Sequence, residues 1–213
     1  MHIALIGATG FVGTALLNEL LQRGHRVTAL ARDPAKIPLR EGLTVVQADA
    51  TDAAQVAQAV RGVDAVASAY NPGWTHPDLH DEFLRGSRAI TAGVKAAGVQ
   101  RLLVVGGAGS LYVAPGVQLV DTPQFPAESK NGALAAREAL NLLRQESTLQ
   151  WTFLSPAILL EPGERTGHYR LGTESPLMNG DQPGKISVAD LAVVIVDELE
   201  APRHLQQRFT VAY

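Results

Sequence analysis

The sequence predicts an α/β protein with a doubly wound, mostly parallel sheet and a small C-terminal lobe. Short, wholly apolar segments alternate along the 213 residues with longer segments whose apolar residues recur at helical spacing. Strands that are apolar on both faces indicate a parallel sheet covered by helices on each side. The segment 156–185 interrupts this rhythm because it is rich in glycine, proline and polar residues. We therefore expect one domain over 1–213, with 156–185 as a lobe or lid at one sheet edge.

The first half of the chain alternates strands and helices. The expected elements are strand 2–6, helix 11–23, strand 26–31, strand 43–47, helix 52–60 and strand 63–69. Residues 11–23 predict a helix because Val12, Leu16, Leu20 and Leu21 lie on one stripe. Asp52 is a typical N-cap residue and sets the start of the next helix.

The second half of the chain continues the alternation of helices and strands. The expected elements are helix 81–97, strand 101–105, helix 131–146, strand 150–154, helix 190–200 and strand 208–212. Gly98 marks the end of the first of these helices. The helix over 131–146 is rich in alanine and leucine, and Asp190 fits the start of the last helix as a structural residue.

Composition excludes several classes of protein. Eighteen basic and 21 acidic residues give a net charge of −3, so no basic field is available for nucleic acid. Cysteine is absent, which excludes disulfides, thiolate metal sites and a catalytic thiol. The N-terminal residues lack a basic segment and cleavage site, and no apolar run approaches the roughly 20 residues that span a bilayer. We expect a cytoplasmic monomer or homodimer that acts on a small molecule, with no nucleic-acid or membrane partner.

The turn IGATGFVG follows the first strand and opens the first helix. Gly7 permits a tight turn, Gly10 lets a pyrophosphate approach the backbone, and Gly13 lets helix and strand pack closely. Free amides at the helix start then face the phosphates. The turn predicts a dinucleotide-binding Rossmann fold, with Thr9, Phe11 and Val12 also beside the cofactor.

The residue after the second strand selects the dinucleotide. An NAD site usually places an acidic residue there to bind the ribose hydroxyls, whereas this chain has Arg32. A guanidinium suits a 2′-phosphate, so NADP(H) is preferred and NAD(H) is possible. The alternative is a surface arginine that pairs with Asp33. Asp49, beside Ala50, is placed to accept from the adenine amino group, although a capping role would also explain it.

Small residues after later strands let the backbone pass close to a flat ligand. These residues are Ser68 and Ala69, then Gly106, Gly107 and Gly109, then Ser155, Pro156 and Ala157. Prolines 123 and 126 indicate a loop after the second glycine-rich turn, which therefore lacks a helix start for a second phosphate. We expect that turn to clear space for the nicotinamide and acceptor rings, with Ser110 as its polar group or, alternatively, as a turn cap.

The segments IGATGFVG, ALAR, ADATD, VVGGAGSL, LSPAILLEPGERTG and RFTVAY resemble those of atypical short-chain dehydrogenase/reductase proteins. The resemblance extends from end to end and points to the branch named NADH-flavin reductases, related to NmrA-like and biliverdin reductase B-like proteins. VVGGAGSL and GERTG are specific to the branch, whereas the first glycine turn is shared by the whole superfamily. The resemblance implies a Rossmann fold, bound NADP(H) and reduction of a flavin- or quinone-like acceptor.

Most members of that superfamily use a Tyr-x-x-x-Lys pair, in which the phenol is the acid/base. This chain has no such pair. Related proteins often carry Tyr-Lys where this chain has Ser129-Lys130, and Ser110 corresponds to the superfamily's catalytic serine. A serine hydroxyl is a much weaker acid than a phenol. Hydride transfer to a conjugated acceptor tolerates this loss, since the proton can come from water.

Candidates for acceptor contact are Tyr70, Trp74, Tyr112 and His168. His76 and His80 lie four residues apart, but Pro77 separates them and no third ligand is evident, so no metal site is expected. The preferred hypothesis is that the protein is an NADPH-dependent reductase of a flavin- or quinone-like acceptor. A non-catalytic NADP(H) sensor of the NmrA kind is the alternative, and an epimerase- or dehydratase-like enzyme ranks third because the chain is short for a sugar-nucleotide domain.

Overall fold

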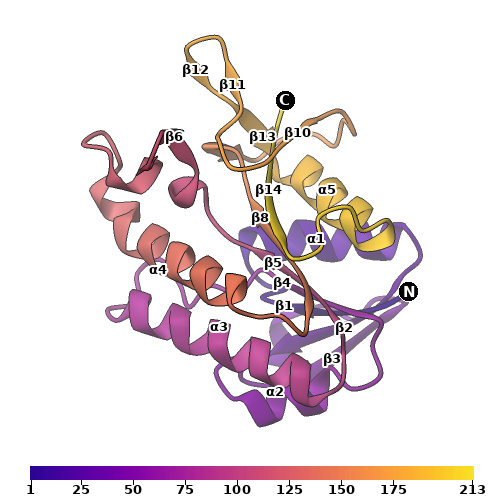
Figure 1. The fold of residues 1–213 in the computed structure, drawn as a ribbon. Coiled ribbons are helices and arrows are strands. Elements are labelled where there is room, and N and C mark those ends of the chain that lie inside the picture. The colour runs from indigo at the N-terminus through magenta and orange to yellow at the C-terminus, as the bar shows by residue number, and fades with distance from the viewer.

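A computed structural model describes residues 1–213 (Figure 1). One eight-stranded sheet has the order β10-β14-β8-β5-β4-β1-β2-β3, parallel throughout except for β10. Its strands are β1 (His2–Ile6), β2 (Arg26–Ala31), β3 (Leu43–Gln47), β4 (Ala65–Ser68), β5 (Arg101–Val105), β8 (Gln150–Ser155), β10 (Arg170–Gly172) and β14 (Gln207–Ala212). The predicted doubly wound, mostly parallel sheet is confirmed.

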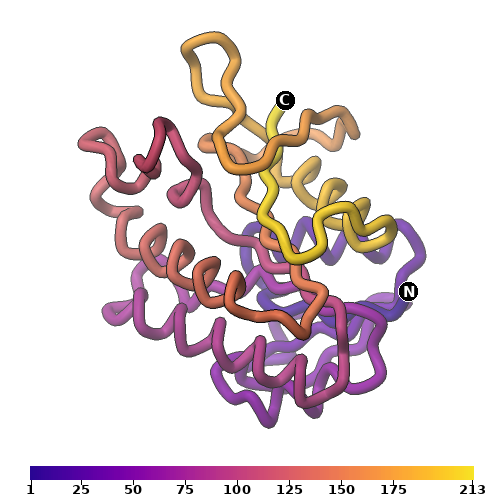
Figure 2. The backbone as a smooth tube through the Cα atoms, viewed as in Figure 1, coloured from indigo at the N-terminus to yellow at the C-terminus, as the bar shows by residue number.

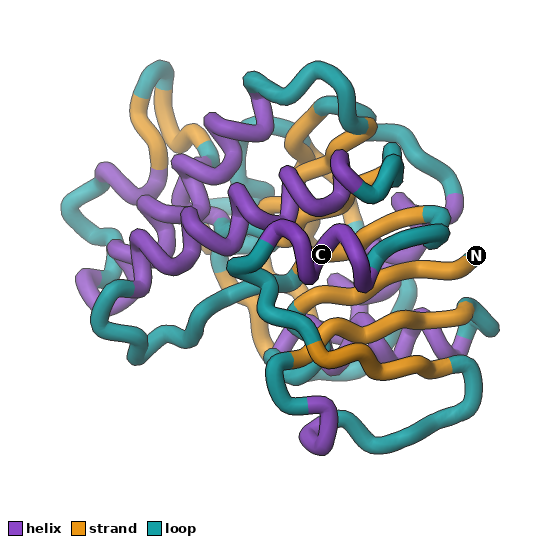
Figure 3. The backbone as a smooth tube through the Cα atoms, turned by 90° about the horizontal axis from the view of Figure 1, so that it is seen from below, coloured by secondary structure: helices purple, strands orange, loops and turns teal.

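Helices cover both faces of the sheet, whose strands form one twisted layer (orange in Figure 3). The helices are α1 (Phe11–Gln22), α2 (Ala53–Ala59), α3 (Leu79–Ala96), α4 (Ala127–Arg144) and α5 (Val188–Glu200). Helices α1 and α5 pack on the face that includes Ile3 and Leu5. Helices α2, α3 and α4 cover the opposite face, where Ala4 and Ile6 point. None of the helices has both the length and the apolar character needed to cross a membrane.

Three small strand pairs supplement the sheet. They are β6 (Tyr112–Ala114) with β7 (Val117–Gln118), β9 (Leu159–Glu161) with β13 (Lys185–Ser187), and β11 (Met178–Asn179) with β12 (Gln182–Pro183). Short 3-10 turns occur at η1 (Pro34–Lys36), η2 (Ala108–Ser110) and η3 (Leu119–Asp121). The β11–β12 hairpin projects beyond the carboxyl ends of the parallel strands, at the top of Figures 1 and 2.

The segment 156–185 is more integrated than a separate lobe. Its strand β10 pairs with β14 and forms an edge of the main sheet, while β9 and β13 pair beside it. Only the β11–β12 hairpin projects. Strands of two or three residues are too short for the alternation of side chains to show in the sequence. Helix α4 also begins earlier than predicted, so Ser129 and Lys130 lie in its first turn.

Candidate functional site

The first glycine-rich turn combines two glycines required by packing with one that is not. Gly7 has a φ of +84°, and a Cβ there would lie 2.4 Å from the carbonyl oxygen of Ala69. A Cβ on Gly13 would lie 1.9 Å from the oxygen of Gly7. The nearest atom to a Cβ on Gly10 is 3.4 Å away, so the protein itself leaves this backbone open. The arrangement fits the close approach of a pyrophosphate at Gly10.

The start of α1 presents unpaired donors at the same place. Its N-cap is Gly10, which offers no side chain, and its first turn contains no acidic residue. The first helical bond runs from the amide of Thr14 to the oxygen of Gly10 at 2.9 Å. The amides of Phe11, Val12 and Gly13 therefore lack helical acceptors, as at any helix start. These donors and the helix dipole favour an anion there.

A cavity of about 200 Å³ lies beside the first glycine turn, next to the ends of β2 and β3. Five of the predicted cofactor residues line it: Gly7, Thr9, Arg32, Asp49 and Ala50. Arg32 is exposed and forms no ion pair with Asp33. Asp33 instead accepts a hydrogen bond from the amide of Ala35 at 3.2 Å and caps η1. Of the alternative, the surface position of Arg32 agrees with the structure, whereas its ion pair with Asp33 does not form.

Two further cations line this cavity that the sequence analysis missed. Lys36 lies in η1, four residues after Arg32, and Arg85 comes from α3. Arg85 donates to Thr51 Oγ1 at 2.8 Å. Lys36 follows Arg32 by four residues across a short turn, and this spacing could have predicted that both side chains face the same cavity. No local pattern indicates Arg85, because only the fold brings α3 to β3.

Asp49 bonds within its own turn, and its contact with the adenine stays a prediction. Its Oδ1 accepts from the amide and hydroxyl of Thr51, at 2.9 and 2.8 Å. The bond from the Thr51 amide, aided by the charges of Arg32 and Arg85, lowers the pKa of Asp49. Its Oδ2 has no hydrogen bond within the protein, and the residue lines the cavity. Asp52 caps α2 through the amides of Ala54 and Gln55, as expected.

The second glycine-rich turn requires a partial correction. A Cβ on Gly106 would lie 1.9 Å from Cζ of Phe153, and one on Gly109 would lie 2.8 Å from Cβ of Ala133. These glycines permit close packing inside the protein and do not clear space for a ligand. Only Gly107 has open space, with its nearest neighbour 3.8 Å away.

Ser110 lies inside the protein, whereas the sequence predicted it as the polar group of an acceptor pocket or as a turn cap. Ser110 is 2% exposed and Ser155 is fully buried. The hydroxyl oxygens of both accept from Nη1 of Arg208, at 3.2 and 3.4 Å. The guanidinium of Arg208 also forms an ion pair with Glu174. Ser110 makes no capping bond either, so it serves as a partner of a buried arginine that the sequence did not reveal.

The side chains around the first turn of α4 meet the loop after β4. Trp74 is 66% exposed, and its ring lies over Gly132, where a Cβ would be 2.7 Å from Cζ3. Ser129 and Lys130 lie on the preceding turn, and Lys130 is exposed without an ion-pair partner. The flat face of Trp74 and the cation of Lys130 thus come from neighbouring segments.

Five other predicted residues lie at different places in the structure. Tyr70 donates to the oxygen of Glu82 at 3.1 Å, and burial raises its pKa to about 12. Ser68 and Tyr70 line a space between α3 and α4, and Tyr70 also lines the cavity described above. Tyr112 is half-buried on β6, whereas Pro156 and Ala157 are buried after β8.

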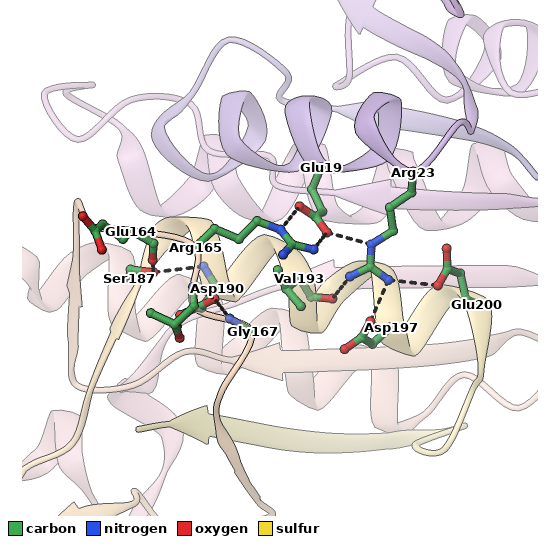
Figure 4. Close-up of polar contacts among 11 residues, drawn as sticks. Glu19, Arg23, Glu164, Arg165, Gly167, Ser187, Asp190, Val193, Asp197 and Glu200 are labelled. Carbon is green, nitrogen blue, oxygen red and sulfur yellow. Dashed lines mark hydrogen bonds and ion pairs between the residues drawn. The ribbon is translucent and has the colours of Figure 1, made fainter.

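His168 belongs to a segment that is fixed along α1 and α5 (Figure 4). Arg165 pairs with Glu19, and the amides of Thr166 and Gly167 donate to Asp190 at 2.8 and 2.7 Å. Residues 165–167 are thus attached to α1 and α5, while the contact of the exposed His168 with an acceptor stays a prediction. The two carboxylates that hold the segment lie far away in the sequence.

Comparison with known proteins agrees with the geometry of the first turn. A family model described as NAD(P)H-binding matches residues 7–202. The chain belongs to the NAD(P)H-binding family. The YwnB protein of Bacillus subtilis, whose function is uncharacterised, is 41% identical over 99% of this chain and 98% of its own.

Two solved structures are similar over the whole chain of this NAD(P)H-binding protein. A Bacteroides thetaiotaomicron protein, provisionally named an epimerase, has a TM-score of 0.93 and 46% identity, covering 100% of this chain and 96% of its own. A Streptococcus pneumoniae protein, provisionally named an NADH-flavin reductase, has a TM-score of 0.87 and 36% identity, covering 100% and 99%. Only the second of these names includes a nicotinamide cofactor, and the two names differ in reaction class.

The residues present fit the dinucleotide that the NAD(P)H-binding family implies. The open backbone at Gly10 and the free amides of α1 suit the pyrophosphate. The cavity lined by Arg32, Asp49 and Ala50 lies where the adenosine half is expected. Gly107 leaves room near the end of β5 for the other half.

Proposed function

We propose that the protein is an NADPH-dependent reductase that transfers hydride to a flavin- or quinone-like acceptor. The observation that carries the cofactor choice is the pair of unpaired cations, Arg32 and Lys36, at the adenosine cavity. A planar guanidinium and an ammonium suit the doubly charged 2′-phosphate of NADP(H). Asp33, the nearest carboxylate to Arg32 in the sequence, also lines the cavity, but its Oδ1 caps η1 through the amide of Ala35.

The acceptor side favours a flat, conjugated molecule. Trp74 presents an exposed aromatic surface beside the first turn of α4, and Gly107 leaves open backbone. A flavin or quinone gains negative charge when it receives hydride, and Lys130 supplies an unpaired cation in the first turn of α4. The bound nicotinamide supplies the hydride, while these residues orient the acceptor and stabilise its charge.

The lack of a phenolic acid supports this choice over carbonyl reduction. No tyrosine has a lysine four residues later, and the phenol of Tyr70 is committed to the oxygen of Glu82. Ketones and aldehydes need a proton delivered to the forming alkoxide, whereas a flavin or quinone spreads the charge over its rings. The same absence favours the second candidate function, an NADP(H)-binding sensor without turnover.

The absorbance of NADPH, followed with a panel of acceptors, separates these functions. The panel contains flavin mononucleotide, a benzoquinone and small aldehydes. We expect oxidation of NADPH with the flavin or the quinone, no oxidation with aldehydes, and a loss of turnover in Lys130→Ala and Trp74→Ala. Arg61→Ala, which changes an exposed arginine with no ion pair, serves as the control. Tight NADPH binding without oxidation by any acceptor would establish the sensor instead.

A further inference from the structure

A cavity of about 360 Å³ lies between α3 and α4, and it exceeds the adenosine cavity of about 200 Å³. The two helices run side by side across one face of the sheet (Figure 2). Small-molecule sites in proteins begin at roughly this volume, about 300 Å³. Ser68 and Tyr70 line this cavity, which reaches the sheet at Ser68 and Val104, but the residues proposed to bind the 2′-phosphate and the acceptor, Arg32, Lys36, Trp74 and Lys130, do not.

The walls of this interhelical cavity are less polar than their sequence suggests. Ser87 donates its hydroxyl to the oxygen of Phe83 at 2.8 Å, and Thr91 donates to the oxygen of Ser87 at 3.0 Å. Both hydroxyls are therefore satisfied by their own helix. Ile90 and Leu142 add apolar surface. The short side chains of Ser87 and Thr91 leave the space that longer residues would fill.

Aromatic rings form one end of the cavity. Tyr70 and Phe83 both line it, with their ring centroids 6.1 Å apart and the planes tilted by 47°. The ring of Tyr70 packs on Gly86, where a Cβ would lie 2.3 Å from Cε1. This close fit holds the ring of Tyr70 in place. Tyr70 lines both the interhelical cavity and the adenosine cavity. An aromatic ligand can stack or meet these rings edge to face.

Two polar groups of the cavity have unused hydrogen-bonding capacity. Ser68 is 3% exposed, and its Oγ accepts from the amide of Tyr70 at 3.4 Å, but no acceptor in the protein receives its proton. Arg88 lies at the exposed rim and forms no ion pair. Lys95 is neutralised by Glu146 at 2.7 Å. The rim therefore carries one unpaired positive charge, and the floor carries one free donor.

We propose that the cavity between α3 and α4 binds a small aromatic hydroxycarboxylate. The carboxylate meets Arg88 at the rim, the ring lies between Ile90, Leu142 and the aromatic end, and the hydroxyl oxygen accepts from Ser68. The ligand's carboxylate would pair with the unpaired guanidinium of Arg88, and its hydroxyl oxygen would accept the free proton of Ser68. Because this ligand and NADPH occupy different cavities, both can bind at once.

Calorimetric titration of the full chain with 4-hydroxybenzoate tests the proposal, with benzoate as a probe that lacks the hydroxyl. We expect saturable binding of one molecule per chain that persists when NADPH is saturating. Arg88→Gln should weaken binding of both probes by about 10-fold or more, the value of a charge-assisted bond. Ser68→Ala should weaken binding of 4-hydroxybenzoate alone. Arg61→Gln, an exposed arginine outside the cavity, should change neither affinity.

A variant that fills the space gives an independent check. Thr91→Phe places a ring in the cavity and removes no bond to another element, since the Thr91 hydroxyl bonds only to its own helix. We expect it to abolish binding of 4-hydroxybenzoate while NADPH still binds, which also shows that the variant is folded. The proposal is overturned if the wild type does not bind the probe, if NADPH displaces it, or if Thr91→Phe binds it normally. A dimer in which a second copy covers α3 and α4 and excludes the probe would also overturn it.

Discussion

Arg165 holds both carboxylate oxygens of Glu19, a residue on the helix that begins at the first glycine-rich turn. Its Nε and Nη2 each donate at 2.8 Å, and Arg23 adds a further bond to Oε1 at 2.7 Å (Figure 4). Glu19 is 4% exposed, and the bond from Arg165 lowers the pKa of its carboxyl. The segment that carries Arg165 is thereby joined to the helix that is expected to hold the pyrophosphate.

Arg165→Ala should destabilise the fold because it leaves one side of a buried carboxylate without a partner. Arg23 remains and Arg165 is partly exposed, so we expect a loss of about 1–2 kcal/mol in the free energy of unfolding. Arg137→Ala is the matched control. Its partner Asp121 is 47% exposed, and such surface pairs contribute below about 1 kcal/mol. Urea unfolding measures both losses, and equal losses would contradict the role assigned to Arg165.

The free energy of unfolding should decrease at low pH because the carboxylate of Glu146 becomes protonated. Lys95 donates to this carboxylate at 2.7 Å, and with the Thr148 hydroxyl it holds the pKa of Glu146 at about 2, below the ordinary 4.5. A lowered folded-state pKa adds stability above the unfolded value, and this stability is lost as the pH falls from 4.5 towards about 2. Unfolding free energies measured across that range should fall less steeply in Glu146→Gln than in the wild type. Glu128→Gln, at an exposed residue without an ion pair, should keep the wild-type slope.

Arg32→Ala should affect the binding of NADPH and the binding of NADH differently. Loss of a charge-assisted bond to the 2′-phosphate predicts a fall in NADPH affinity of about 10- to 100-fold, with little change for NADH. Lys36→Ala should act in the same direction with a smaller effect, since an ammonium lacks the forked geometry. Calorimetric titration of both dinucleotides against each variant measures the affinities. An unchanged NADPH affinity in Arg32→Ala would refute the assignment of the 2′-phosphate.

Gly106→Ala and Gly107→Ala form a matched pair in the second glycine-rich turn. The methyl group at position 106 would overlap the ring of Phe153, so this variant should lose stability or fail to fold. The methyl group at position 107 meets only ordinary contacts, so this variant should fold normally. If the nicotinamide or the acceptor lies over Gly107, the turnover of Gly107→Ala should fall. The melting temperature of this variant should stay near that of the wild type. Wild-type turnover in Gly107→Ala would place the reacting rings elsewhere.

Local patterns predicted most of the fold because each signal lay within one element. The strand at 2–6, the cap at Asp52 and the turn at Gly7 all agree with the structure. The segment 156–185 was harder, because strands as short as β10 carry no periodicity and depend on partners such as β14.

The site was predictable where the chain itself makes the turn, and less so where distant segments meet. Arg32 could be found from its place after β2, whereas Arg85 and Arg208 reach their positions only through the fold. The glycines of the second turn show the same limit. A glycine that admits a ligand and one that admits Phe153 look identical in a sequence.

The antiparallel pairing of β10 has a consequence for the order in which the chain assembles during synthesis. Strands β1 to β5 have sheet partners among themselves, and β8 pairs with β5, so none of these pairings needs a strand that is synthesised after β8. Strand β10 has no partner in the sheet except β14, which is synthesised later. The edge of β8 therefore stays open until β14 arrives, and this interval is when a nascent chain is most exposed to pairing with another copy.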